Sequence, residues 1–293
     1  MLLGVAGLTP GDWTTVNENV TRAVRKHGFR ALQLRVSEPF NPEPALAERV
    51  KNAFGAAGLA LSQTVGEYGG GLVSADESLR REAVEALKRM TAFTRIIGGT
   101  NTYLRPGSMN PRGAWMPHPD NRSDEVFDRL VRSSREAARA AADEGVMLAV
   151  EGGAVCPLFS AVRTREFFDA VDSPSMGYNM DPVNYVSDLE TAYDSTSLLD
   201  DLFDQLGHVT IAAHAKDFAV EEGLLPHFKE AVIGEGLLDQ ATFLRRMLAV
   251  RPDAHIFIEH LPDELVPAAR DGLNAAADRA GISWDNPPDC LNL

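Results

Sequence analysis

The sequence predicts an α/β fold, a (β/α)8 (TIM) barrel that residues 1–293 form as one domain ending in a short C-terminal tail. Short apolar or β-branched runs alternate with longer segments in which apolar residues recur every three or four positions. Eight such strand-and-helix pairs fit into 293 residues, and about 250 residues is typical of this barrel. The last four strands also end in acidic or imidazole side chains, at the end where such barrels hold their active sites.

The predicted strands are short runs bounded by polar residues or glycine. They begin with LLGVA and end with HIFIEHL, and most are too short for a helix of ordinary length. In order, they cover residues 2–6, 31–36, 59–65, 94–99, 147–152, 176–181, 209–215 and 255–261.

The helices predicted between the strands carry start and stop signals. The segment 12–28 ends in basic residues and Gly28. The segment 123–145 begins with Ser123 and acidic residues and ends at Gly145. A doubly wound open sheet is the alternative, but its first turn would normally contain G-x-G-x-x-G, which VAGLTPGDW lacks. The other predicted helices cover 42–58, 75–93, 163–171, 187–207, 238–250 and 263–281.

Two long loops are predicted on the catalytic face of the barrel. One covers residues 105–121 after the fourth strand, and the other covers 218–236 after the seventh. Loop elaborations of barrel enzymes gather on this face, so we expect both loops to shape a substrate pocket.

Composition excludes several classes of protein. The formal net charge of −14 argues against nucleic acid and anionic membrane surfaces as partners, because both attract basic faces. The sequence contains no run of 18 apolar residues and no signal peptide, so we expect a cytoplasmic protein without a transmembrane helix. The two cysteines, Cys156 and Cys290, indicate neither a disulfide framework nor a cysteine-ligated zinc site.

The last four predicted strands end in Glu151, Asp181, His214 and Glu259. Side chains at these strand ends face one shared cavity. Three carboxylates there would repel one another, and a divalent cation would relieve the repulsion. Three oxygen ligands and one nitrogen suit Mn²⁺, Mg²⁺ or Co²⁺, whereas Zn²⁺ more often takes further His or Cys ligands. We therefore predict one divalent metal ion, with Mn²⁺ as the first choice.

Each of these four residues has a structural alternative when it is taken alone. Asp181 can cap a helix or join a salt bridge, His214 can be a hydrogen-bonded core residue, and Glu259 can pair with an arginine. The occurrence of all four on successive strands favours the metal site.

Five short motifs resemble those of a known family. They are VEGG at 150–153, MDPVNY at 180–185, HAKDF at 214–218, IGEG at 233–236 and IEH at 258–260. Their order and spacing resemble the xylose isomerase-like TIM-barrel superfamily, which contains sugar isomerases and epimerases, inosose dehydratase and endonuclease IV. The resemblance implies that the four strand-end residues bind a divalent metal.

The resemblance also implies a metal-dependent sugar isomerase or epimerase with a small polyhydroxylated carbonyl substrate. A carboxylate removes the proton beside the polarised carbonyl and gives an enediolate. Glu151 and Glu259 are the candidate bases. Lys216 is a candidate for steadying an oxyanion or protonating a leaving group, with a salt bridge to Asp217 or Glu235 as its alternative role.

The same ligands serve other reactions. A lyase, either a keto-inositol or keto-sugar dehydratase or a 3-keto-glycoside deglycosidase, is the alternative. A non-catalytic barrel that acts as a partner subunit is the third hypothesis. Many epimerase and endonuclease members have D-x-x-H after the sixth strand, and Asn184 stands where that histidine would be. Endonuclease IV needs more histidines for its three metals, which argues against DNA repair.

Five further residues are candidates for substrate binding. Asn184 can hydrogen-bond a hydroxyl, and His118 can close over the substrate from its loop. Glu67 and Arg105 follow the third and fourth strands and can bind hydroxyls or a carboxylate. Trp115, like Trp13, can stack on a sugar face, although loop tryptophans more often pack under the loop. The sequence leaves open whether the substrate is phosphorylated and is compatible with a homo-oligomer.

Overall fold

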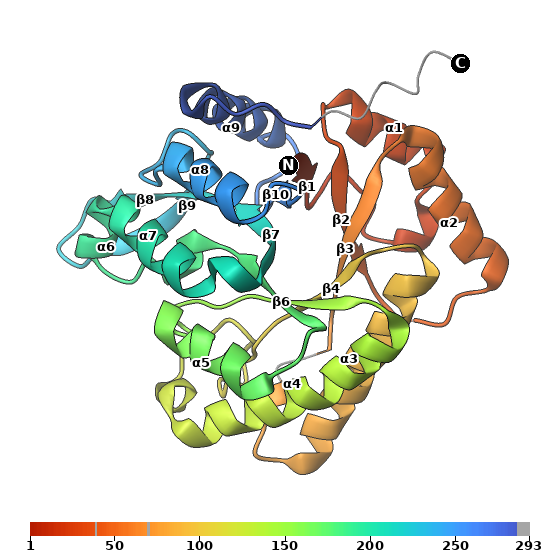
Figure 1. Ribbon diagram of the computed structural model, residues 1–293, viewed down its shortest axis with the longest axis horizontal. Helices are drawn as coiled ribbons and strands as arrows, with labels where there is room; N and C mark the ends of the chain where they lie inside the picture. Colours follow the sequence, from red (N-terminus) through yellow and green to blue (C-terminus); the bar gives the residue numbers. More distant parts are fainter. Residues whose placement is uncertain (39, 69–70, 286–293) are drawn as a thin grey trace.

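The computed structural model describes residues 1–38, 40–68 and 71–285. The predicted C-terminal tail falls on residues 286–293, outside these ranges. Eight parallel strands form a closed barrel in the order β1-β10-β7-β6-β5-β4-β3-β2, with the helices around it (Figure 1), so the predicted fold class is confirmed. The barrel strands are β1 (Leu2–Val5), β2 (Ala31–Val36), β3 (Ala60–Gly66), β4 (Asn101–Leu104), β5 (Met147–Val150), β6 (Met176–Met180), β7 (Thr210–Ala215) and β10 (His255–Ile258).

The helices begin and end largely where their capping residues predict. Ser123 caps one helix by accepting a hydrogen bond from the backbone N–H of Val126, and Gly145 ends it in the left-handed conformation. The α-helices are α1 (Glu18–Lys26), α2 (Pro44–Ala57), α3 (Glu77–Ile96), α4 (Asp124–Glu144), α5 (Ala161–Val171), α6 (Leu189–Tyr193), α7 (Ser195–Leu206), α8 (Gln240–Val250) and α9 (Val266–Ala280). Short 3-10 helices cover Trp13–Thr15, Gly71–Val73, Pro119–Arg122, Pro182–Tyr185 and Gly207–Val209.

The fourth strand lies later in the chain than predicted, so the strand predicted over 94–99 is wrong. That apolar run instead continues α3, because Met90, Phe93, Thr94 and Ile97 are buried at helical spacing. The fourth strand is NTYL, residues Asn101–Leu104, and it follows a turn that contains Gly98 and Gly99. Arg105 therefore directly follows β4 at the mouth of the barrel.

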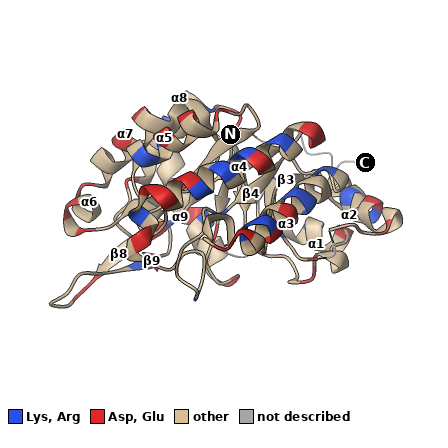
Figure 2. Cartoon of the chain, turned by 90° about the horizontal axis from the view of Figure 1, so that it is seen from below, with Lys and Arg blue, Asp and Glu red and all other residues tan. Residues whose placement is uncertain are grey.

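The two predicted loops are confirmed, although the second contains regular structure. Strands β8 (Asp217–Glu221) and β9 (His227–Ala231) pair antiparallel, beginning one residue before the predicted loop 218–236, and project from the barrel (Figure 2). Asp217 holds the base of this hairpin by accepting hydrogen bonds from the backbone N–H groups of Gly234 (2.9 Å), Gly236 (3.1 Å) and Leu238 (3.0 Å). The IGEG motif therefore has a structural role, and Asp217 is committed to it.

Apolar side chains fill the space between the barrel and the helices. Trp13 belongs to this core, with its ring 4.7 Å from that of Phe93 and its Nε1 donating to the carbonyl of Ser37 at 3.1 Å. Because only 1% of Trp13 is exposed, the sugar stacking suggested for it is wrong.

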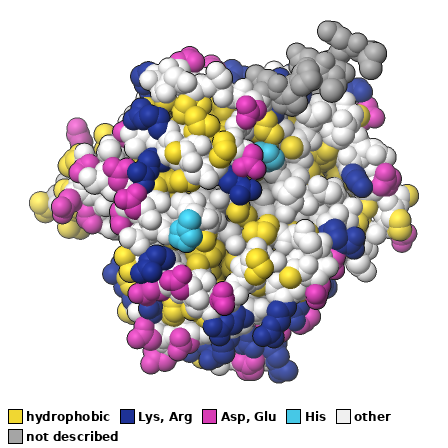
Figure 3. Space-filling model, viewed as in Figure 1, with side chains coloured by type: hydrophobic (Ala, Val, Ile, Leu, Met, Phe, Trp, Pro, Cys, Tyr) yellow, Lys and Arg dark blue, Asp and Glu magenta, His cyan; other side chains and the backbone are white. Residues whose placement is uncertain are grey.

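Charged side chains lie mainly on the outside of the helical layer. Lys and Arg are mixed with Asp and Glu along α3 and α4 (Figure 2), and on the face shown in Figure 3 they gather mostly toward the periphery. Among the helices that the structure describes, none is long and apolar enough to cross a membrane. Location in the cytoplasm stays a prediction.

Candidate metal and substrate site

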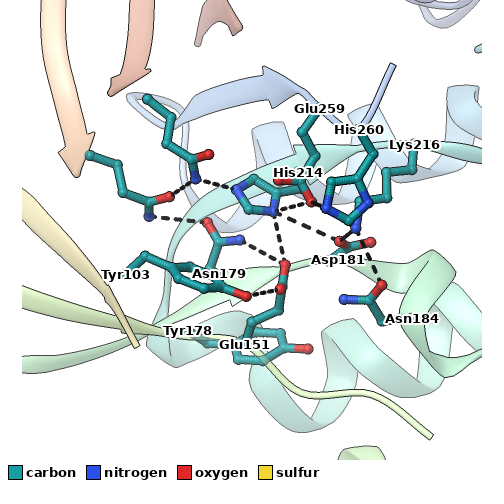
Figure 4. A network of polar contacts seen from close by, with 12 residues as sticks. Tyr103, Glu151, Tyr178, Asn179, Asp181, Asn184, His214, Lys216, Glu259 and His260 are labelled. Atoms are coloured by element: carbon teal, nitrogen blue, oxygen red, sulfur yellow. Dashed lines mark hydrogen bonds and ion pairs between the residues drawn. The ribbon is translucent and has the colours of Figure 1, made fainter. Parts of the chain in front are cut away.

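The four predicted metal ligands meet at the carboxyl end of the barrel. Glu151, Asp181 and Glu259 follow β5, β6 and β10, and His214 lies near the end of β7. One ligand atom from each residue lies within 4.8 Å of all the others. Nδ1 of His214 is 2.9 Å from an oxygen of Glu151 and 2.9 Å from an oxygen of Glu259 (Figure 4).

Lys216 is a fifth member of the cluster. Its Nζ lies 2.6 Å from Oδ2 of Asp181 and 2.7 Å from Oε1 of Glu259, and it donates to Oδ1 of Asn184 at 3.3 Å. Lys216 therefore pairs with the predicted ligands and not with Asp217, which is bound to the hairpin. The three carboxylates are compensated by two basic side chains, so they are less isolated than the sequence predicted.

The mixture of charges sets the pKa values in the cluster. Burial opposes protonation of His214, but Glu259 and Glu151 outweigh it and raise its pKa well above the usual value. Burial raises the pKa of Glu151, whereas His214 and Lys216 outweigh the same burial at Glu259 and hold its pKa well below the usual range. A metal ion that takes Nδ1 therefore competes with a proton for this atom.

The residues present fit a hard divalent cation. Asp181 is wholly buried, and its Oδ1 has no hydrogen-bond partner, which is costly for a carboxylate without a cation beside it. Three carboxylates and one imidazole are ligands that Mn²⁺, Mg²⁺ and Co²⁺ accept, and Zn²⁺ also accepts them. The cluster can therefore hold one such ion.

Neutral polar residues that the sequence did not point to surround the cluster. The side-chain amide of Gln33 is hydrogen-bonded to Nε2 of His214 at 2.8 Å. Asn179 donates to Oε1 of Glu151 at 3.2 Å, and the hydroxyl of Tyr103 donates to Oε2 of the same residue (Figure 4). These contacts orient the ligands from behind.

The amides continue into the barrel as a layer. Gln33 bonds to Gln63, which donates to Oδ1 of Asn101 at 2.7 Å. The register shifts between Leu32 and Gln33, and this shift places Gln33 opposite Gln63 on β3. The sequence signal for these amides was weak, because Gln63 lies between Ser62 and Thr64 and Asn101 begins its strand.

A cavity of about 700 Å³ opens onto the cluster, within the usual range for small-molecule sites. Four of the five predicted substrate-binding residues, Glu67, Arg105, Trp115 and Asn184, line it. His118 does not belong to the lining. Its Nδ1 accepts a hydrogen bond from the backbone N–H of Asp120 at 3.2 Å and caps a short 3-10 helix.

Two backbone features explain motifs beside the cluster. A Cβ atom on Gly153 would lie 2.9 Å from Cβ of Asn184, so the glycine lets the chain after Glu151 approach Asn184 closely. His260 has a φ of 64°, which is uncommon for a residue other than glycine. Its Nδ1 contacts Glu230 of β9 at 2.8 Å, so the hairpin meets the cavity there.

Residues 21–280 match the family model described as xylose isomerase-like TIM barrel. The chain belongs to this family. No curated protein sequence matches it significantly. The family relationship is consistent with the motifs that end strands β5, β6, β7 and β10.

Several solved structures share the fold. A xylose isomerase domain protein from Planctomyces limnophilus superimposes with a TM-score of 0.73 at 18% identity, covering 96% of this chain and 97% of that one. A xylose isomerase-like protein from Mycobacterium smegmatis in complex with magnesium gives 0.69 at 14% identity, covering 95% of both chains. The 3-keto-D-glucoside 4-epimerase of E. coli gives 0.68 at 17% identity, covering 95% and 99%. L-ribulose 3-epimerase and D-psicose 3-epimerase are among the other structures with this fold.

Proposed function

We propose that this protein is a divalent-metal-dependent sugar isomerase or epimerase. The observation that carries the proposal is the buried cluster of Glu151, Asp181, His214 and Glu259, whose ligand atoms lie within 4.8 Å of one another beside a sugar-sized cavity. Structures of sugar epimerases share the fold. A bound Mn²⁺, or Mg²⁺, Co²⁺ or Zn²⁺ in its place, would polarise a substrate carbonyl as a Lewis acid.

Glu151 and Glu259 are the proposed bases. They come from β5 and β10, which are separated by β6 and β7 in the barrel, and each lies 2.9 Å from Nδ1 of His214. One can remove the proton beside the carbonyl and the other can return it from another direction. Return to the opposite face of the same carbon gives epimerisation, whereas return to the neighbouring carbon gives isomerisation.

Three side chains support this proton transfer. Tyr103 fixes the carboxylate of Glu151 through its hydroxyl. Lys216, held by Asp181 and Glu259, is placed to stabilise negative charge that develops on a substrate oxygen. Asn184 lies beside Lys216 and offers an amide to a substrate hydroxyl.

The first experiment measures metal content by mass spectrometry after mild dialysis. We expect about one divalent ion per chain in the wild type and its loss in the double variant His214→Ala/Glu151→Gln. The control is His208→Ala/Glu235→Gln, which changes the same residue types at exposed positions outside the cluster. If the wild type neither retains metal nor takes up added Mn²⁺, the proposal is wrong and the non-catalytic barrel is favoured.

The second experiment follows a panel of keto sugars with the Mn²⁺-loaded enzyme in D₂O. Deuterium incorporation with all substrate oxygens retained supports an isomerase or epimerase. Loss of a hydroxyl or alkoxy group assigns the protein to the lyases instead, as a keto-inositol or keto-sugar dehydratase or a 3-keto-glycoside deglycosidase.

A further inference from the structure

The cavity has a second charged region, built by strands on the other side of the barrel from Asp181. Arg35 lies on β2, Glu67 follows β3 and Arg105 follows β4, and all three line the cavity. We call these three residues the arginine region. None of them contacts the four metal ligands directly among the interactions of the described residues.

Arg105 is a buried cation with weak polar partners. Only 12% of its side chain is exposed, and its guanidinium lies over the rings of Tyr68 (5.5 Å) and Tyr103 (5.9 Å). It donates to the carbonyl of Gly66 at 3.3 Å and to Oε2 of Glu67 at 3.4 Å. Charge-assisted hydrogen bonds are usually about 2.7–2.9 Å long. The guanidinium is therefore fixed by aromatic packing, while its donors are poorly satisfied.

One carboxylate serves both cations of the arginine region. Glu67 lies 3.3 Å from Arg35 as well as 3.4 Å from Arg105, and 66% of its side chain is exposed to solvent. An exposed carboxylate compensates a buried cation only partly, because water screens it. This region consequently carries an excess positive charge in a protein whose net charge is −14.

The rest of the cavity does not supply the missing negative charge once a divalent ion is bound. The carboxylates of Glu151, Asp181 and Glu259 are then balanced by that ion and by Lys216. His260 is paired with Glu230 at 2.8 Å. The side chain of Arg35 is 72% exposed, so water screens its charge as it screens that of Glu67. Among the described lining residues, the uncompensated positive charge is that of the buried Arg105.

We propose that the sugar substrate carries a carboxylate that binds Arg105; this rests on the proposed function. A guanidinium matches a carboxylate with two parallel hydrogen bonds. A carboxylate also brings one negative charge, whereas a phosphate ester brings nearly two at neutral pH. Tyr103 connects this region to the proposed base, because the guanidinium of Arg105 lies over its ring and its hydroxyl donates to Glu151. A bound acid group and the base Glu151 would therefore both lie beside Tyr103.

The test compares matched substrates on the full-length Mn²⁺-loaded enzyme. Each ketohexose of the panel is paired with the uronate in which a carboxylate replaces its terminal CH₂OH group and with its terminal phosphate ester. The readout is kcat/KM for deuterium exchange. We expect the uronate to be preferred over the neutral sugar by about 30-fold or more, and over the phosphate ester as well.

Two variants in the arginine region are expected to change this preference in opposite directions. Arg105→Met keeps the packing between the tyrosines and should lower the uronate-to-neutral ratio by about 30-fold or more. Glu67→Gln removes the competing carboxylate and should raise the ratio about two- to fivefold. Arg95→Met is the matched control, because Arg95 pairs with Glu144 on the outer helices. Arg105→Lys serves as a second variant if Arg105→Met does not fold.

The outcomes separate this inference from the proposed function. If neutral sugars exchange deuterium as well as uronates, or if Arg105 variants leave the ratio unchanged, the inference is wrong and the proposed function stands. Preference for the phosphate ester also overturns it. If no sugar exchanges, the proposed function fails, and calorimetry then decides. Arg105→Met must weaken the binding of D-gluconate more than the binding of D-glucitol. If it weakens the binding of both equally, the proposal that Arg105 binds a carboxylate is wrong.

Discussion

Each end of the barrel holds a histidine, wholly buried at one end and partly buried at the other, and the pKa values of the two are shifted in opposite directions. His214, near the end of β7, lies among three carboxylates that raise its pKa well above the usual value. His255, at the start of the neighbouring β10, is bonded to the hydroxyl of Ser62, and burial lowers its pKa. The surroundings favour the protonated imidazole at one end and the neutral imidazole at the other.

This difference separates function from stability within one barrel. Charge is concentrated at the carboxyl end, where the loops provide a cavity and where barrel enzymes hold their active sites. Between the two ends lies the layer of neutral amides, which orients the charged end without adding charge to it. Substitutions at the three levels should therefore differ in what they affect and by how much.

The largest effect is expected at the charged end from Lys216→Met. Loss of the cation should lower kcat by about 100- to 1,000-fold, because Lys216 stabilises developing negative charge. Mn²⁺ affinity should not weaken, because Lys216 competes with the metal for Asp181 and Glu259. Without metal, the free energy of unfolding should fall by about 3–5 kcal/mol, since a buried charge pair is broken. Turnover, calorimetric metal binding and urea denaturation measure the three quantities.

Lys229→Met is the control for this substitution, because Lys229 lies on the exposed hairpin and pairs with Glu221 at 3.2 Å. We expect no comparable change there. If Lys216→Met loses Mn²⁺ as completely as the ligand variants do, Lys216 stabilises the metal-bound site. The prediction that Lys216 competes with the metal for Asp181 and Glu259 is then wrong.

An intermediate effect is expected in the amide layer from Gln33→Met. When Nδ1 of His214 binds a metal, Nε2 carries the hydrogen and needs an acceptor, which the side-chain oxygen of Gln33 provides after the amide turns. Its loss should weaken Mn²⁺ binding about 10- to 100-fold, measured by calorimetry. Gln63 contacts Gln33, which in turn contacts His214, so Gln63→Met should weaken Mn²⁺ binding less than Gln33→Met does. A larger loss for Gln63→Met would show that the layer acts through packing instead.

The smallest effect is expected at the other end from His255→Asn. The folded pKa of His255 is lowered, so the unfolded chain takes up a proton near its ordinary value of 6.5 that the folded protein does not. Wild-type stability should therefore fall as pH drops below about 6.5, and the variant should lose this part of the decline.

Urea denaturation in EDTA between pH 7.5 and pH 5.5 measures the difference between the two proteins. The charged end is common to both, so its own titration cancels. An equal decline in both proteins would mean that His255 does not contribute.

The charged end was largely predictable because its residues follow apolar runs. Glu151, Asp181, His214 and Glu259 each end a strand, and parallel strands of a barrel bring such ends together. Lys216 was also found, although its partners were not. His118 was placed by its loop alone, and the structure puts it outside the cavity lining. The fourth strand was misplaced because a β-branched run at the end of a helix resembles a strand.

The sequence by itself determined the order of strands and helices, the barrel and the four converging strand ends, because these depend on local periodicity and chain order. Only the tertiary structure decided which side chains form hydrogen bonds and charge pairs with one another. Gln33 meets His214 across 181 positions through the register of separate strands, and Arg105 meets Tyr68 and Tyr103 only once the barrel closes. Hydrogen bonds and charge pairs depend on distances of a few tenths of an ångström, which no pattern along the chain encodes.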